Sequence, residues 1–250
     1  MSKALITGAS SGIGREIAMI LSERGYDLIL VARRTARMEE LKQQLQTDVR
    51  IITADLSDPQ SCFDLYEQTR NEEIDVLVNN AGFGLHGAFA ETDLNTELNM
   101  IDLNIKAVHI LTKLFVRDFI AKDSGYILNV ASAAAFMPGP FSETYYATKG
   151  YVLRLSADLN RELKEAGSNV SVSAFCPGPV ATEFTDHLDV GPSFRERNCR
   201  FASERAVCGM FRRKTVITPG VNENLVHLAG KLLPDALQSK ISYSVQKKRK

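Results

Sequence analysis

Long apolar stretches are missing from this sequence of 250 residues. No run approaches the roughly 18 residues that a membrane-spanning helix needs, so we expect no membrane span. The apolar stretch near the N-terminus is short and runs directly into a glycine loop, so we expect no signal peptide. An excess of charge is also missing, because 30 basic residues balance 30 acidic ones. The composition therefore gives no reason to expect a nucleic-acid partner.

Cysteine and histidine are scarce, with four residues of each type. The cysteines are scattered and form no CxxC pair, which argues against a disulfide framework and favours a reducing cytoplasm. The histidines show no metal-ligand spacing, so we expect no metal site. These residues are Cys62, Cys176, Cys199, Cys208, His86, His109, His187 and His227.

The balance of apolar and charged residues is that of a folded globular protein, at 44% hydrophobic and 24% charged. A mostly disordered chain would be poorer in apolar residues. The length is sufficient for a full hydrophobic core, and no linker rich in proline, glycine or serine divides the chain. We therefore expect one domain over residues 1–250.

Short apolar runs alternate with longer helical patterns along most of the chain. The runs are rich in Val, Ile and Leu and apolar on both faces, as parallel strands covered by helices are. The pattern predicts a Rossmann-like, doubly wound parallel α/β sheet of about seven strands with helices on both faces. The expected strands are 4–7, 28–32, 49–53, 76–79, 126–130, 170–176 and 215–218; the expected helices are 12–24, 35–45, 59–71, 94–120 and 144–166.

Two segments depart from this alternation. Residues 177–205 are irregular and rich in proline and glycine, and we interpret them as a lid over a substrate site. Residues 234–250 end in four basic residues, and we expect them to form a frayed, solvated tail.

A glycine-rich turn, TGASSGIG at 7–14, follows the first expected strand and opens the first expected helix. Glycines permit a tight turn and a close approach to a pyrophosphate, and the helix N-terminus offers free N–H donors. Because loops also use glycine for conformation alone, the strand–turn–helix context is what favours a dinucleotide site. The expected contacts are Gly8, Ser10, Ser11, Gly12, Ile13 and Gly14.

The end of the second expected strand indicates which dinucleotide is bound. NAD sites usually carry an acidic residue about 20 positions after the glycines, whereas this strand ends in Arg33 and Arg34. Two guanidinium groups favour the 2′-phosphate of NADP(H) over NAD(H), and Arg15 is a further candidate. Asp55 has two interpretations: it accepts from the adenine amino group, or it caps the helix that starts at Pro59.

A tyrosine and a lysine four residues apart, Tyr145 and Lys149, start the helical stretch 144–166. They lie on one helix face, where an ammonium group lowers the pKa of a neighbouring phenol. Such a tyrosine exchanges protons near neutral pH. Ser132 lies just past the end of the strand 126–130, where open α/β sheets form their sites, and can hold a substrate carbonyl oxygen.

These motifs together closely resemble the short-chain dehydrogenase/reductase family. TGxxxGxG at 7–14, NNAG at 79–82, Asn104, Ser132, YxxxK at 145–149 and PGPVAT at 177–182 stand in the family's order. The resemblance covers roughly residues 2–220. Within the family, the sequence looks like a bacterial branch of general reductases.

The resemblance implies a seven-stranded sheet, a nicotinamide dinucleotide and a role for each motif. Tyr145 would be the general acid/base, with Ser132 orienting the substrate carbonyl. Lys149 would bind the nicotinamide ribose, and Asn104 would support a proton relay through water. The remaining cofactor contacts implied are Leu56, Asn80, Ala81, Gly82, Pro177, Gly178, Val180 and Thr182.

We therefore expect a cytoplasmic NADP-dependent carbonyl reductase or alcohol dehydrogenase. The residues expected around the carbonyl are mostly aromatic, which favours an apolar ketone or aldehyde. They are Phe83, Phe136, Met137, Phe141 and Phe184, with Phe194 on the lid. The alternative is that several of them are plain core, and that Arg195 or Arg197 turns inward toward an anionic substrate.

Other functions and the assembly were also weighed. A dinucleotide-binding regulator without catalysis is disfavoured by the intact Ser132, Tyr145 and Lys149 set. Epimerase or dehydratase chemistry is disfavoured because relatives with that chemistry have larger C-terminal domains. The family also implies a homodimer or homotetramer built through the helices at 94–120 and 144–166.

Overall fold

The computed structural model describes residues 2–183 and 197–247. Its centre is a seven-stranded sheet in the order β3-β2-β1-β4-β5-β6-β7, and every neighbouring pair is parallel. The predicted fold class is confirmed, and each expected strand is found to within two residues. The strands are β1 Lys3–Thr7, β2 Asp27–Ala32, β3 Val49–Thr53, β4 Ile74–Asn79, β5 Gly125–Val130, β6 Val170–Phe175 and β7 Val216–Ile217.

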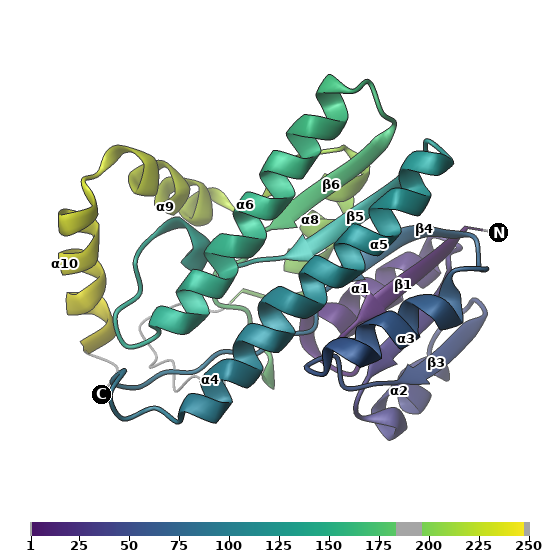
Figure 1. Ribbon diagram of the computed structural model, residues 1–250, viewed down its shortest axis with the longest axis horizontal. Coiled ribbons are helices and arrows are strands. Elements are labelled where there is room, and N and C mark those ends of the chain that lie inside the picture. Colours follow the sequence, from purple (N-terminus) through teal and green to yellow (C-terminus); the bar gives the residue numbers. More distant parts are fainter. Residues whose placement is uncertain (1, 184–196, 248–250) are drawn as a thin grey trace.

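Helices cover both faces of the sheet (Figure 1). On one face pack α1 (Gly12–Glu23), α2 (Thr35–Lys42) and α8 (Cys199–Phe211). On the other face pack α3 (Pro59–Thr69), α5 (Val108–Ala121) and α6 (Glu143–Glu165). Side chains alternate along each strand, so Ile6 joins the first core and its neighbour Leu5 joins the second.

The stretch predicted as one regular helix at 94–120 contains a π-helical segment, Asp102–Ala107, between α4 (Leu94–Ile101) and α5. The wider turn shifts the buried face by about one residue. The predicted apolar stripe holds in α5, where Leu111 is buried, but fails in α4, where Leu98 is 48% exposed. The stripe predicted at Leu98 was therefore wrong.

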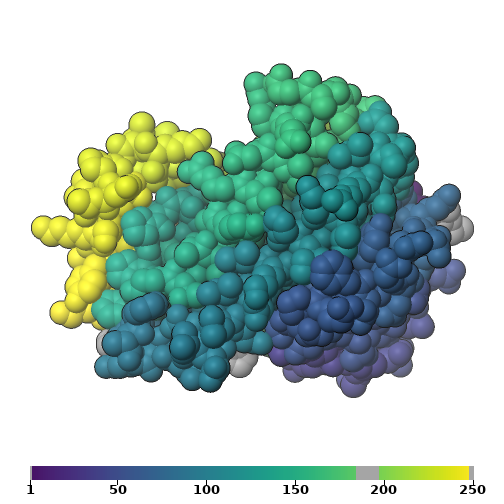
Figure 2. All heavy atoms as spheres, in the orientation of Figure 1, coloured from purple at the N-terminus to yellow at the C-terminus, as the bar shows by residue number. Residues whose placement is uncertain are grey.

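The segment expected to be a tail is largely helical. Helix α9 (Val221–Leu232) is followed at Pro234 by α10 (Asp235–Gln246). Figure 2 shows both in yellow at the left end of the molecule. The irregular stretch expected at 177–205 ends earlier, because α8 begins at Cys199 and the Asn198 side chain caps it by accepting from Phe201 N at 3.1 Å. The rest of the predicted lid, residues 184–196, lies outside the described residues. The sequence analysis missed these helices because Pro219, Pro234 and the basic residues at the end of the sequence are typical of irregular, solvated segments.

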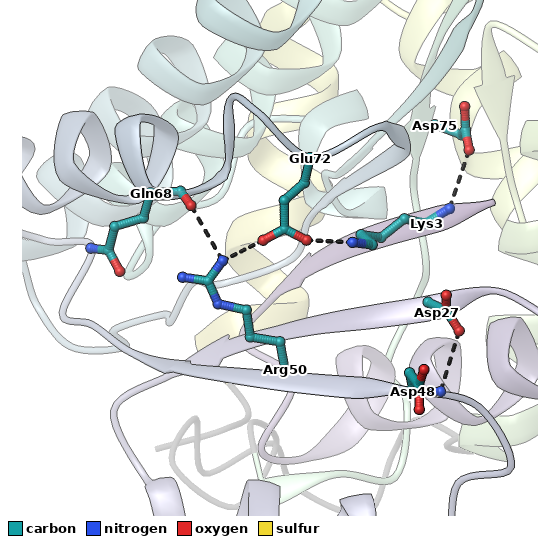
Figure 3. A network of polar contacts seen from close by, with 7 residues as sticks. All are labelled: Lys3, Asp27, Asp48, Arg50, Gln68, Glu72 and Asp75. Atoms are coloured by element: carbon teal, nitrogen blue, oxygen red, sulfur yellow. Dashed lines mark hydrogen bonds and ion pairs between the residues drawn. The ribbon is translucent and has the colours of Figure 1, made fainter. Parts of the chain in front are cut away.

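A polar network ties the strands together at the sheet edge where they begin. Glu72, in the connection to β4, accepts from Lys3 of β1 and Arg50 of β3 (Figure 3). Arg50 also donates to the carbonyl oxygen of Gln68 in α3, at 3.3 Å, and Lys3 N donates to Asp75 at 3.1 Å. These charged groups connect β1, β3 and the start of β4 at the edge opposite the carboxyl ends of the strands. Within the two described ranges, no helix has the length and hydropathy to cross a membrane.

Candidate active site

A cavity of about 1220 Å³ runs along the carboxyl ends of the strands. It begins at the loops after β1, β2 and β3, passes those after β4, β5 and β6, and is bounded by α9 and α10. The strand order reverses at β1, between β2 and β4, and such a switch point is where open α/β sheets bind ligands. The cavity brings together most of the site residues predicted from the sequence.

The glycine turn cannot accept larger residues. Gly8 and Gly12 have φ angles of +66° and +54°, in the left-handed region. A Cβ at Gly8 would lie 2.7 Å from Nδ2 of Asn80, and one at Gly14 would lie 2.5 Å from the Gly8 carbonyl oxygen. At the N-cap of α1, Ser11 makes no side-chain hydrogen bond to the first turn. The turn therefore presents backbone N–H groups at a close-approach surface, which fits a pyrophosphate.

The NNAG segment after β4 supports this turn. Thr7 Oγ1 accepts from the N–H groups of Asn80 and Ala81, at 2.9 and 3.1 Å. Asn80 Nδ2 donates back to the carbonyl oxygens of Thr7 and Gly8, at 3.0 and 3.1 Å. The segment lines the cavity with Gly82 and fixes the loop after β1 from the side.

Arg33 and Arg34 both line the cavity at the end of β2. Arg34 donates to the hydroxyls of Ser10 and Ser11, at 3.2 and 2.8 Å, and to Glu183 at 2.9 Å. Arg33 is 69% exposed at its side chain and lies 3.7 Å from Asp55. The turn and the two guanidinium groups thus form one anion-binding corner.

Sequence reasoning missed two residues of this corner and misplaced a third. Glu183 pairs with Arg37 as well as Arg34, and hydrogen bonds from these two arginines lower its pKa to about 2. The sequence carries no signal for contacts between segments about 150 residues apart. Arg15 does not line the cavity; it donates instead to Gln44 Oε1 at 2.8 Å.

Asp55 is not the cap of α3. That position belongs to Asp58, whose carboxylate accepts from the N–H groups of Gln60 and Ser61, at 3.1 and 3.2 Å. The helix-cap interpretation of Asp55 was therefore wrong. Asp55 accepts instead from Ser57 and lines the cavity together with Leu56.

Ser132, Tyr145 and Lys149 converge on the cavity wall. Ser132 follows β5 and caps the short helix η2 (Ala133–Phe136), accepting from Ala134 N at 3.1 Å. Tyr145 and Lys149 are one turn apart on α6, and both are more than 90% buried. Lys149 Nζ donates to the carbonyl oxygen of Val130 at 2.9 Å and lies 5.9 Å from the centre of the Tyr145 ring.

Burial dominates the protonation of this pair. It raises the pKa of the Tyr145 phenol, and a hydrogen bond with Ser132 offsets only part of the increase. It also lowers the pKa of Lys149 to about 8. The spacing alone predicted a lowered tyrosine pKa, and the structure shows the opposite. The reason is that an enclosed phenolate loses more hydration than its neighbours restore.

Asn104 lies in the π-helical segment, fully buried behind the cavity wall. Its Oδ1 accepts from Phe83 N at 3.1 Å, and its Nδ2 donates to the Phe83 carbonyl and to Thr148 Oγ1, at 2.9 and 3.1 Å. A Cβ at Gly82 would lie 2.8 Å from Asn104 Oδ1 and 3.4 Å from Lys149 Nζ. Asn104 thus joins the loop after β4 to α6.

The PGPVAT segment closes the cavity from the side of β6. Pro177, Gly178, Val180 and Thr182 all line the cavity. A Cβ at Gly12 would lie 3.1 Å from Cγ2 of Thr182, which places this loop directly against the glycine turn.

The predicted apolar pocket is only partly as expected. Phe83 and Met137 line the cavity, whereas Phe136 stacks on His227 at 4.2 Å and Phe141 lies beside Tyr243. Phe136 and Phe141 were therefore placed wrongly, because a loop's position in the sequence does not say which way its side chains turn. Phe184, Phe194 and Arg195 lie outside the described residues. The lining residues that sequence reasoning missed include Phe201, Val226, Ile241, Ser242, Val245 and Gln246.

Arg197 lines the cavity, but its guanidinium group forms an ion pair with Glu223. Its Nε and Nη2 donate to the two carboxylate oxygens of Glu223, at 2.7 and 2.8 Å. Glu223 is 6% exposed. Among the described residues, no group of three or more His, Cys, Asp or Glu is arranged to hold a metal ion.

Comparison with known proteins agrees with this geometry. The family model for short chain dehydrogenase matches residues 2–191. An uncharacterized oxidoreductase of Staphylococcus saprophyticus is 40% identical over 188 residues, which are 74% of this chain and 76% of that protein.

Two solved structures are similar over nearly the whole chain. One is a short-chain dehydrogenase from Sphingobium yanoikuyae in complex with NADPH, with 31% identity, a TM-score of 0.83 and coverage of 97% of this chain and 95% of that one. The other is a bulky-bulky ketone specific alcohol dehydrogenase from Comamonas testosteroni, with 29% identity, a TM-score of 0.80 and coverage of 97% and 94%. The chain therefore belongs to the short chain dehydrogenase family and is an oxidoreductase of that type.

Proposed function

We propose that this protein is an NADP(H)-preferring carbonyl reductase or alcohol dehydrogenase that acts on apolar ketones or aldehydes. One observation carries the proposal: a buried tyrosine, Tyr145, faces a large cavity between a serine hydroxyl and a lysine one helical turn away. These are the groups needed to position a carbonyl oxygen and to exchange its proton.

The cofactor site follows from the glycine turn and the arginine corner. The N–H groups at the start of α1 would hold the pyrophosphate, and Arg33 and Arg34 would pair with a 2′-phosphate. Asp55 would accept from the adenine amino group. When bound, the nicotinamide supplies or accepts the hydride. The NADPH complex of the similar Sphingobium protein supports this preference.

The proton comes from the protein. Tyr145 stays protonated well above neutral pH, so its hydroxyl is a proton donor to the carbonyl oxygen during reduction. The Ser132 hydroxyl would hydrogen-bond the same oxygen and fix its position. Lys149, with a pKa of about 8, is mostly a cation at neutral pH and would bind the nicotinamide ribose. Asn104 would keep the loop after β4 aligned with α6 and support a proton relay through water.

The substrate class follows from the cavity wall beyond Tyr145. Phe83, Met137 and Val226 are apolar, and the charge of Arg197 is matched by Glu223. Burying apolar substrate surface there contributes about 25 cal/mol per Å². The Comamonas alcohol dehydrogenase, which is specific for bulky-bulky ketones, supports this inference.

A panel of ketones matched in reactivity but differing in charge tests the proposal. The assay follows NADPH oxidation, and we expect higher kcat/KM for the apolar members. A preference for anionic ketones that is lost in Arg197→Ala would contradict the substrate class. No turnover of any panel member would contradict the enzyme assignment. Assembly as a homodimer or homotetramer and a cytoplasmic location stay predictions, the first testable by light scattering.

A further inference from the structure

Helix α10 buries a stripe of polar residues, while its apolar residues are the more exposed ones, including Ile241 and Val245 at the mouth of the cavity. Three polar side chains at intervals of four residues are almost fully buried: Gln238 at 3% exposure, Ser242 at 8% and Gln246 at 2%. Leu237 and Ile241, by contrast, are more than 40% exposed. This is the reverse of the usual amphipathic helix, so the buried polar stripe requires an explanation.

Two of the three polar residues bond to the protein. Gln238 Nε2 donates to the carbonyl oxygens of Gly230 and Leu233, at 3.1 and 2.7 Å, and so holds the turn between α9 and α10. Gln246 Nε2 donates to the phenol oxygen of Tyr146 at 2.7 Å. Gln246 and Tyr146 both line the cavity, whereas Gln238 does not.

Ser242 is different. A serine inside a helix commonly donates to the carbonyl oxygen four residues earlier, as Ser244 does to Lys240 at 3.0 Å. Ser242 makes no such bond, and its hydroxyl has no hydrogen-bond partner among the described residues, although the residue is more than nine-tenths buried and lines the cavity. The hydroxyl is accessible from the cavity and uses no protein partner, so it is available to hydrogen-bond a group that enters the cavity.

The surroundings of Ser242 define that partner. Its neighbours on the cavity side of α10, Ile241, Val245 and Gln246, carry no charge. Tyr146, which Gln246 contacts, has its ring 6.1 Å from that of Tyr145, so this part of the wall lies beside the reacting end of the cavity. Neutral donors and acceptors set in an apolar wall select a neutral oxygen, because an isolated charge would lose its hydration there.

We propose that Ser242, with Gln246 and Tyr146 beside it, forms a polar subsite for a second, uncharged oxygen of the substrate. Resting on the proposed function, this narrows the substrate class to bulky, mostly apolar ketones or aldehydes that carry a hydroxyl or a further carbonyl group. The subsite also gives a role to the buried polar residues of α10 that line the cavity, Ser242 and Gln246. A site built to hydrogen-bond a substrate hydroxyl discriminates against the analogue that lacks it.

The test compares decalone with its hydroxylated derivatives, the isomeric hydroxydecalones, which share its carbon skeleton. We expect at least one hydroxydecalone to exceed decalone in kcat/KM for the parent protein. Ser242→Ala should reduce that gain by about 2- to 10-fold, the value of one uncharged hydrogen bond, and leave decalone unchanged. Ser244→Ala is the matched control, because it removes an exposed hydroxyl from the same helix.

Calorimetry gives a second readout that needs no turnover. Decalin alcohols and the corresponding diols can bind to protein loaded with NADPH but cannot react there. We expect at least one diol to bind more tightly than the alcohol, and Ser242→Ala to reduce this preference by the same factor. The proposal is overturned if no isomer is preferred, if Ser242→Ala keeps the preference, or if Ser244→Ala loses it equally. Diol preference without turnover of any ketone would support the subsite and contradict the proposed function.

Discussion

Replacing Tyr145 with phenylalanine removes one oxygen atom from the cavity wall. The ring keeps its volume, so neither a void nor a clash follows, and its edge-on contact with Tyr146 is kept. The loss is the phenol's hydrogen bond with Ser132, worth about 1 kcal/mol. For a chain of this length the melting temperature should change by no more than about 4 °C.

The effect on catalysis should be much larger. General acid–base catalysis typically contributes about 10²- to 10⁴-fold, so kcat for ketone reduction should fall by that factor. This corresponds to about 3–5 kcal/mol of transition-state stabilisation. NADPH should bind as before, because the substitution leaves the glycine turn and the arginine corner intact.

Stopped-flow measurement of NADPH oxidation gives kcat. Fluorescence titration gives the NADPH affinity, and thermal denaturation gives the melting temperature. Tyr126→Phe is the control, since it removes a phenol oxygen from β5 that does not line the cavity. If Tyr145→Phe reduced ketones within a few-fold of the parent rate, Tyr145 would not be the proton donor. A melting temperature lowered by 10 °C or more would instead show that the reasoning from volume was wrong.

Three further predictions concern the charged groups. Arg33→Asp should weaken NADPH and strengthen NADH, measured by titrating both cofactors; equal affinities in the parent protein would refute the preference. Because burial holds the pKa of Lys149 near 8, its ammonium is present below that pH, so kcat/KM for reduction should fall as the pH rises through about 8. A pH profile that stays flat to pH 10 would show that this charge is not used. Glu183→Gln should free Arg34 and Arg37 and tighten binding of 2′,5′-ADP several-fold but not of ADP, and equal effects on both nucleotides would show that Glu183 does not compete for the arginines.

The sheet could be predicted from the sequence because its strands are buried on both faces. Such strands have continuous apolar runs, for example Val76–Val78 in β4, whereas the surrounding helices have apolar residues only at every third or fourth position. The glycine turn could also be predicted from the sequence. Its backbone adopts a positive φ at Gly8, a conformation that glycine adopts much more readily than other residues. Ser132 followed from its place past the end of a strand and Tyr145 from its spacing to Lys149, whereas the role of Asn104 came only from the family resemblance.

The remainder depended on contacts that no local pattern records. Whether Phe136 faces the cavity or His227 is decided by the path of one loop, and Glu183 contacts Arg34 although the two residues are 149 positions apart in the sequence. Helix α10 was missed because its period places Ser242 and Gln246 inside, against the rule that apolar residues are buried.

The π-helical segment at Asp102–Ala107 changes the helical register between α4 and α5, which are continuous with it. An extra residue in a turn rotates everything before it by about 100° relative to everything after it. Deleting one residue from the segment would restore a regular α-helix, but α4 and α5 could then no longer both keep their present contacts. Either Met100 would leave the core or Asn104 would turn away from Phe83. The irregular turn therefore lets α5 bury its apolar stripe while Asn104 presents its side-chain amide to the loop after β4.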